Sequence, residues 1–201
     1  MANKDVRFGL KPVDQGGGDY TGHTSLYFAP SGYATDLFIG DPVTITGTAN
    51  TAVVRDHGIA TLPEVNVSGV GDAVVISAVI VGFKPVTQDD NVYGTLSTER
   101  VIHCVDDPTV IFEIQADGAI PATSIGLNAV LIATHGGSTV TGMSGMELDT
   151  TSAAPAANAS NQLTILRAVD RLDNDTTITH SKVLVRITNH TNVHGVIGID
   201  S

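Results

Sequence analysis

The chain has 201 residues, a length that suits one domain, or one domain with long arms, and allows a core without disulfides or metals. Its formal net charge of −11 argues against a DNA- or RNA-binding protein, because phosphate contacts need clustered cations. The single cysteine, Cys104, excludes an intrachain disulfide, and the abundance of Gly, Thr, Ala, Val and Ser favours strands and turns over helices.

The first segment, residues 1–33, is predicted to be an N-terminal arm. It begins with charged residues and no apolar stretch, so we expect no secretory signal and a soluble protein made in a cytoplasm. It continues with the glycine-rich stretch DQGGGDYTGHTS and holds most of the few aromatic residues of the chain. An arm of this kind gains order by packing on a neighbour, and the alternative is that its aromatics cover the core of the protein itself. The candidate interface residues are Phe8, Tyr20, Tyr27, Phe28 and Tyr33.

The central segment, residues 34–189, is predicted to be a β domain. Its expected strands are short, rich in β-branched residues and bounded by Gly, Asp or Pro. They are Pro42 to Gly47, Asp72 to Phe83, Glu99 to Val105, Thr109 to Gln115, Ala129 to Thr134, Leu163 to Val169 and Ser181 to Thr188. None of these apolar runs approaches the roughly 18 residues that a membrane span needs, so we expect no membrane partner.

The periodicity of these segments indicates an all-β fold. In the segment from Thr109, the apolar residues Val110, Phe112 and Ile114 alternate with a second row that ends in Glu113 and Gln115. This pattern is typical of a strand with one buried face. No segment sustains a period near 3.6, so helices should be short or absent. We therefore expect a jelly-roll-like β-sandwich or barrel with an extended arm and a C-terminal tail over residues 190–201.

The aspartates that precede proline or glycine are candidates for either chemistry or turns. Asp41 and Asp107 each precede a proline, and Asp117 precedes a glycine. Asp106 lies directly before Asp107. Asp-Pro and Asp-Gly favour turns, because the carboxylate bonds nearby backbone and proline forces the preceding residue out of the helical region. We interpret these aspartates as turn formers. A hydrolase that uses the carboxylates is the less favoured alternative.

Other motifs fall short of a catalytic or metal-binding constellation. His190 and His194 have a spacing that suits a metal on a helix, but Thr191 and Gly195 make a helix there improbable. The stretch around Ser144 lacks the second glycine of a nucleophile elbow, because Met146 stands in its place. We therefore expect no catalytic residue, no cofactor and no metal.

Seven stretches, which together span nearly the whole chain, resemble the capsid decoration, or cement, proteins of tailed bacteriophages. They are FGLKPV, YFAPSGYATDLFIGDPVTITG, AVIVGFKP, VDDPTVIFEIQADG, IGLNAVLI, STVTGMSGMELD and LTILRAVDRLDND. The resemblance implies a β-rich, non-enzymatic protein on the outer surface of an icosahedral head. Such proteins are usually trimers at threefold or quasi-threefold positions and clamp adjacent capsomers.

The partners implied by the resemblance are the major capsid protein, two further copies in a homotrimer, and neighbouring decoration subunits. The implied location is the capsid surface of the virion, reached from the host bacterial cytoplasm during assembly. A virion adhesin or carbohydrate-binding β-sandwich is the alternative. An aromatic content of 4% and the lack of tryptophan weigh against it, because sugar rings stack on exposed aromatic side chains.

Overall fold

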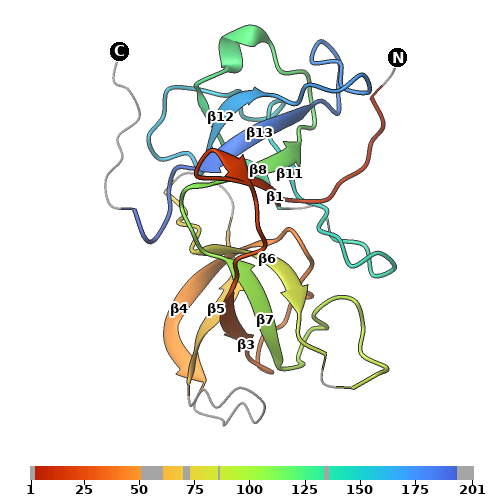
Figure 1. The fold of residues 1–201 in the computed structure, drawn as a ribbon, viewed down its shortest axis with the longest axis vertical. Coiled ribbons are helices and arrows are strands. Elements are labelled where there is room, and N and C mark those ends of the chain that lie inside the picture. Colours follow the sequence, from red (N-terminus) through yellow and green to blue (C-terminus); the bar gives the residue numbers. More distant parts are fainter. Residues whose placement is uncertain (1–2, 51–60, 70–72, 86, 134–135, 194–201) are drawn as a thin grey trace.

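The computed structural model describes residues 3–50, 61–69, 73–85, 87–133 and 136–193. These residues form two β lobes stacked along the long axis of the molecule (Figure 1). The lower lobe is a closed barrel of β3 (Ser25–Ala29), β4 (Pro42–Asn50), β5 (Leu62–Val67), β6 (Ala78–Phe83) and β7 (Arg100–Val105). The upper lobe holds β1 (Lys11–Gln15), β2 (Gly18–Asp19), β8 (Val110–Gln115), β9 (Asn128–Ala129), β10 (Leu131–Ile132), β11 (Glu147–Leu148), β12 (Leu163–Ala168) and β13 (Lys182–Ile187).

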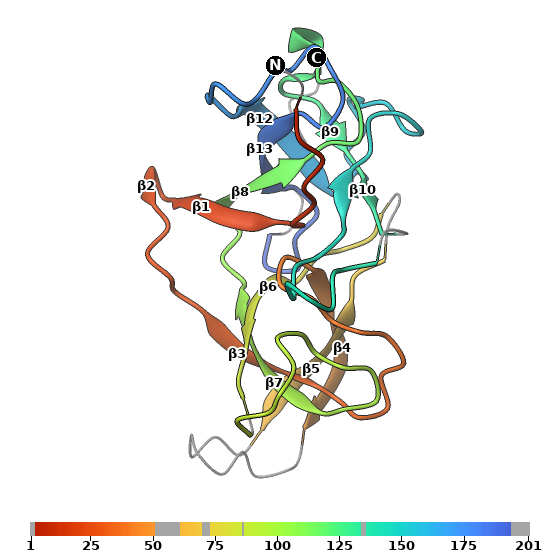
Figure 2. The ribbon, with the colours of Figure 1, turned by 90° about the vertical axis from the view of Figure 1, so that its right-hand side faces the viewer.

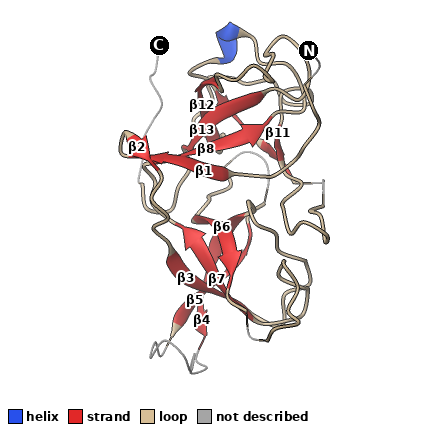
Figure 3. Ribbon diagram, turned by 45° about the vertical axis from the view of Figure 1, so that its right-hand side comes forward, coloured by secondary structure: helices blue, strands red, loops and turns tan. Residues whose placement is uncertain are grey.

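The predicted all-β class, with a sandwich or barrel architecture, is confirmed. Within the described ranges, the single helical element is the 3₁₀ turn Ala122–Ser124, and strands and loops make up the rest (Figure 3). Each of the seven predicted strand segments contains or overlaps a strand, and the observed bounds differ mainly at the ends. The structure resolves the architecture into a barrel and a separate open sheet, rather than one jelly roll.

The barrel closes because β3 pairs on both sides. It runs antiparallel to β7 from Ser25 to Ala29, and it meets β5 in parallel at Phe28. The interior is filled partly by small residues such as Ala78 and Cys104, which suit a barrel of only five strands. Burial also raises the pKa of the Cys104 thiol, which makes it a packing residue rather than a reactive one.

The upper lobe is built on an antiparallel sheet of order β2-β1-β8-β13-β12-β9. Its core receives the side chains that β-strand alternation directs to one face, among them Phe112, Val185 and Ile165. The separate β10-β11 pair contributes Leu131 and Leu148 to the same core. The six-stranded sheet and the small sheet thus share one hydrophobic cluster.

The two lobes meet through β6 and β7, whose residues alternate between two cores. Ala78 and Ile80 face the barrel interior, while Val79 between them belongs to the core of the upper lobe. Likewise Cys104 lies in the barrel and the adjacent Val105 in the upper core. The alternation of strand side chains therefore joins the lobes into one folded body.

The predicted N-terminal arm is wrong from residue 11 onward. Strand β1 pairs with β8 in the upper sheet, and β3 is one wall of the barrel, so residues 11–29 are part of the folded body. The chain passes from β2 in the upper lobe down to β3 in the barrel (Figure 2). The pairing partners lie about 70 to 100 positions away in sequence, which is why local composition did not reveal them.

The N-terminal segment crosses the Gly-Asp-Pro turn at very short range. Gly9 and Gly40 both have positive φ, 67° and 97°, and the amide of Leu10 donates to the carbonyl of Gly40 at 2.9 Å. A Cβ on Gly40 would lie 2.2 Å from the carbonyl oxygen of Phe8, and one on Gly9 would lie 2.4 Å from that of Gly40. Both positions therefore require glycine.

The predicted C-terminal tail is described only over residues 190–193. His190 forms a parallel bridge with Ile76, and the hydroxyls of Thr191 and Ser77 lie 2.6 Å apart. This first part of the tail is thus joined to the chain segment that enters β6. The remainder of the predicted tail lies outside the described residues.

Candidate functional site

Three loops gather beside the barrel and form a surface that we call the loop flank, consisting of residues 34–41, 87–99 and 136–146 (Figure 2). Leu37 pairs with Gly94 in an antiparallel bridge, with amide-to-carbonyl distances of 2.7 and 2.8 Å. Ile39 pairs in parallel with Met143. These backbone bonds tie the three loops to one another, so the loop flank is a continuous, hydrogen-bonded layer.

Side chains strengthen this layer. The rings of Phe38 and Tyr93 are stacked with centroids 5.3 Å apart, which joins the first loop to the second. The carboxylate of Asp36 accepts a hydrogen bond from the amide of Leu96 at 2.7 Å. The loop flank is therefore a built surface rather than a set of independent loops.

The loop flank presents large apolar side chains to solvent. Val140 is 86% exposed, Val92 is 55% exposed and Leu96 is 49% exposed. The loops of Val92 and Val140 touch, because Gly142 packs against the backbone carbonyl of Val92. Exposed apolar side chains that gather on neighbouring loops suit a contact with another protein.

Asp41 lies at the base of the loop flank and is only 3% exposed. Its carboxylate accepts a hydrogen bond from the amide of Phe38 at 2.8 Å, which is the turn role predicted from the Gly-Asp-Pro sequence. The hydroxyl of Ser144 also bonds this carboxylate. Burial outweighs both donors and raises the pKa of Asp41 to about 6, because the charged form loses its hydration.

Asp41→Asn is expected to stabilise the protein at pH 8 but not at pH 4. The pKa rises from 3.8 in the unfolded state to about 6 in the folded state, so the protonated form of Asp41 favours folding. The stability gained from this proton is complete below about pH 4 and is lost as the pH rises through about 6. The shift corresponds to about 3 kcal/mol. Urea unfolding at the two pH values measures the difference, and an equal effect of the substitution at both would contradict the raised pKa.

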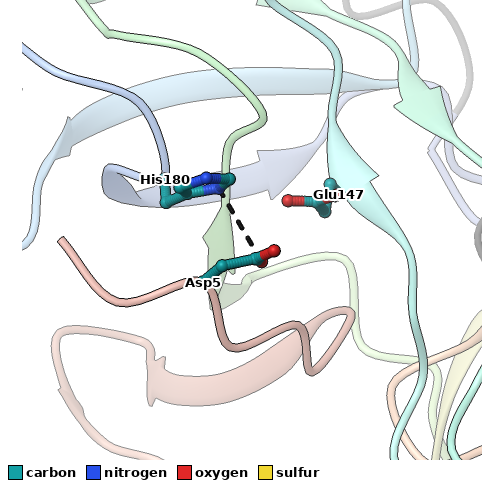
Figure 4. A group of neighbouring side chains, drawn as sticks. All are labelled: Asp5, Glu147 and His180. Carbon is teal, nitrogen blue, oxygen red and sulfur yellow. Dashed lines mark ion pairs between the residues drawn. The ribbon is translucent and has the colours of Figure 1, made fainter.

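Asp5, Glu147 and His180 form a cluster between the N-terminal segment and the upper lobe (Figure 4). Their candidate ligand atoms all lie within 4.8 Å of one another, and Nδ1 of His180 is 3.7 Å from Oδ1 of Asp5. Glu147 is 1% exposed, whereas the side chain of Asp5 is 45% exposed. Among the described residues, this is the group with a geometry that could hold a divalent cation.

The positive charge beside these carboxylates comes from Arg7. Its Nε lies 2.9 Å from Glu147, and its Nη2 lies 3.5 Å from Asp5. The amide group of Gln115 donates to both carboxylates at 2.8 Å, and its oxygen accepts from the amide of Val6 at 2.9 Å. A divalent cation would have to compete with the guanidinium, so we interpret the cluster as an ionic tie that fixes residues 5–7 to the upper lobe.

Arg7→Met is expected to lower the free energy of unfolding by about 3 kcal/mol, because it leaves the buried Glu147 carboxylate without its guanidinium. The double variant Arg7→Met with Glu147→Gln should regain most of that loss, since the neutral amide can still accept from Gln115. Chemical denaturation of the single and double variants measures the coupling. A double variant that loses the sum of the two single effects would show that the two side chains do not interact.

The other predicted turn aspartates, Asp106, Asp107 and Asp117, all have defined hydrogen-bond partners. Asp107 accepts from the amide and the hydroxyl of Thr109, both at 2.7 Å, which lowers the pKa of Asp107 and confirms its turn role. Asp106 and Asp117 bond remote residues instead: the hydroxyl of Tyr27 at 3.0 Å, and the amide and hydroxyl of Thr150 at 2.8 and 2.7 Å. Asp107 also accepts from the side-chain amide of Gln15 at 2.8 Å, so all three aspartates connect distant parts of the chain.

His190 and Ser144 have structural surroundings. His190 is 3% exposed, its Nδ1 accepts from the amide of Asn192 at 3.0 Å, and burial lowers its pKa. His194 lies outside the described residues. Ser144 is 1% exposed, and its hydroxyl oxygen accepts from the amide of Met146 at 3.1 Å. Neither residue is placed for chemistry on an external substrate.

The five predicted interface aromatics differ in burial and in their contacts. Tyr27 and Phe28 are 6% and 7% exposed, so the prediction that they contact a partner is wrong for these two. The hydroxyl of Tyr20 donates to the carbonyl of His23 at 2.6 Å, and that of Tyr33 accepts from the amide of Val67 at 2.9 Å. Phe8 is partly buried where the N-terminal segment crosses the Gly40 turn. A contact through Phe8, Tyr20 or Tyr33 stays a prediction.

No protein-family model, curated protein or solved structure matches this chain. The resemblance to decoration proteins therefore stays a prediction. Among the described residues, no helix has the length and apolar character needed to cross a membrane.

Proposed function

We propose that the chain is a bacteriophage capsid decoration protein that binds the outer surface of the head through the loop flank. The observation that carries the proposal is the exposure of Val140, Val92 and Leu96 on loops held together by backbone hydrogen bonds. The sequence resemblance supplies the class of protein. The loop flank replaces the N-terminal arm as the proposed contact surface, because β1 and β3 are committed to the fold.

An ordered contact surface suits a cement protein. Binding through loops that are already fixed loses little conformational entropy, so more of the gain from apolar burial appears as affinity. A contact of standard size buries about 800 Å² on each partner, and a trimer of such contacts gains further from avidity. The net charge of −11 would keep free subunits from aggregating before they reach the head.

The proposed assembly is a homotrimer at threefold or quasi-threefold positions of the shell, in contact with the major capsid protein and with neighbouring decoration subunits. The proposed location is the outer capsid surface, after synthesis in the bacterial cytoplasm. In this role the protein adds contacts across a junction between capsomers. Those contacts must break before the shell can open under the pressure of packaged DNA.

The proposed cement role is tested by heating DNA-filled heads that lack the protein and measuring the temperature at which DNA is released. Purified protein is expected to raise that temperature in a saturable manner. Light scattering on the protein alone and on the decorated heads measures the trimer and its copy number. An unchanged release temperature at saturating protein would contradict the cement role.

A further inference from the structure

A cavity of about 540 Å³ opens beside the loop flank, at the end of β6. Its walls come from the end of β6 and the residues after it, from the loop that carries Val92, and from the first residue of β7. The lining residues are Phe83, Lys84, Pro85, Thr87, Gln88, Asp90, Asn91, Val92 and Arg100. Val92 belongs both to this cavity and to the exposed apolar surface, so the two features are continuous.

The cavity brings two cations together in a strongly acidic protein. Its lining includes two cations, Lys84 and Arg100, and one anion, Asp90. The whole chain carries 21 acidic residues against 10 Lys and Arg. Cations gathered in such a chain favour an anionic ligand.

Arg100 is the central group of the cavity. It is 7% exposed, and its Nη1 donates to Asp90 at 2.5 Å. Asp90 is itself held by the amide and hydroxyl of Thr87, at 3.1 and 2.8 Å. The buried Nε of Arg100 has no hydrogen-bond partner among the described residues. A buried guanidinium with an unmet donor is an incomplete arrangement, because unpaired buried polar groups are costly.

The geometry points to a site for a carboxylate side chain, a glutamate or aspartate presented by the protein that the loop flank contacts. A guanidinium has a planar fork of donors that matches a carboxylate, and Lys84 lines the same cavity. The walls of Phe83, Pro85 and Val92 suit the methylene groups of an acidic side chain. Inorganic phosphate has no methylene groups to fill these walls. The identity of the partner rests on the proposed function.

The first test is a titration that does not involve heads. N-acetyl-glutamate N-methylamide, which has one side-chain carboxylate, is added to the ¹⁵N-labelled protein while the Nε–H signal of Arg100 is followed by NMR. N-acetyl-glutamine N-methylamide is the neutral probe of the same shape, and inorganic phosphate is the dianion. We expect a saturable shift with the glutamate probe and an affinity at least about tenfold lower for either of the other two probes. No shift, or an equal shift with the glutamine probe, would overturn the site.

Matched variants of Gln88 test the charge requirement without altering the Arg100–Asp90 pair. Gln88 is exposed and lines the cavity, so its replacement should leave the unfolding temperature unchanged. Gln88→Glu is expected to weaken binding of the glutamate probe about tenfold, and Gln88→Lys is expected to preserve or strengthen it. Equal affinities for the two variants would overturn the electrostatic basis of the site.

Head binding by the same variants separates this inference from the proposed function. If the glutamate probe binds but no form of the protein binds heads, the carboxylate site stands and the decoration role fails. If heads bind wild type and Gln88→Glu equally and the probe produces no shift, the site fails and the decoration role stands. If Gln88→Glu loses affinity for both the probe and the heads while Gln88→Lys keeps both, the carboxylate of the partner occupies the cavity.

Discussion

Removal of residues 1–33 is expected to unfold the protein rather than to release a folded domain from its partner. The deletion takes away β1, which covers one side of β8, and β3, which closes the barrel between β5 and β7. It also removes Leu10 and Tyr27 from the two cores. The expected result is the loss of cooperative thermal unfolding and of dispersed amide signals.

A single substitution in β3 tests the same assignment without removing whole strands. Tyr27→Ala should lower the free energy of unfolding by about 3 kcal/mol, because it opens a cavity in the barrel and frees Asp106 from its hydroxyl donor. A truncated protein that still unfolds cooperatively and gives dispersed signals would show that residues 1–33 form a dispensable arm. The assignment of β3 to the barrel would then be wrong.

Val140→Asp and Val92→Asp are expected to weaken binding to heads about thirtyfold each, or about 2 kcal/mol, while the unfolding temperature stays the same. Both side chains are largely solvent-exposed on the loop flank, so a charge there costs little in the free protein and much in a desolvated contact. Co-sedimentation with heads that lack the protein, over a range of protein concentrations, measures the affinity.

Leu172→Asp is the matched control for these variants. Leu172 is fully exposed, lies just beyond β12 in the upper lobe and is outside the loop flank. Its substitution makes the same change of an exposed aliphatic residue to a carboxylate and should leave head binding unchanged. If Leu172→Asp weakened binding while Val140→Asp and Val92→Asp did not, the upper lobe would be the contact surface and our assignment of the loop flank would be wrong.

The strands that the sequence predicts correctly are those with strong local patterns. Val110, Phe112 and Ile114 are all buried, as their alternation indicates. The same alternation predicts that Glu113 and Gln115 face solvent, yet both are buried. Glu113 pairs with Arg171 at 2.7 Å, and Gln115 bonds Asp5 and Glu147. Their partners come from distant segments, and no local periodicity contains that information.

The strands that the sequence did not predict depend on tertiary pairing. Strand β3 follows a glycine-rich stretch that is typical of a linker, and β7, its partner, begins about 70 residues later. Strand β5 contains Pro63, which opposes Ala49 where the register with β4 shifts. Proline is tolerated there because a bulge does not require its missing amide donor. The glycine-rich stretch before β3 and the proline in β5 therefore did not indicate the strands that the barrel requires.

The candidate site was predictable only in part. The turn role of Asp41 followed from its place before Pro42, but its raised pKa comes from burial, which depends on the loop flank packed around it. Val140 is a single apolar residue between threonines, a signal too weak to mark a surface. Arg100 and Asp90 lie ten positions apart, and no local pattern indicates that their side chains pair. Surfaces assembled from loops have no sequence period of their own.

The decoration role is tested by co-sedimentation of the purified wild-type protein with DNA-filled heads that lack it. We expect saturable binding, with a copy number that is a multiple of three per contact position and a plateau that Val140→Asp reaches only at higher protein concentration. A wild-type protein that stays in the supernatant at every concentration would contradict the decoration role. The loop flank would then have to serve a different partner.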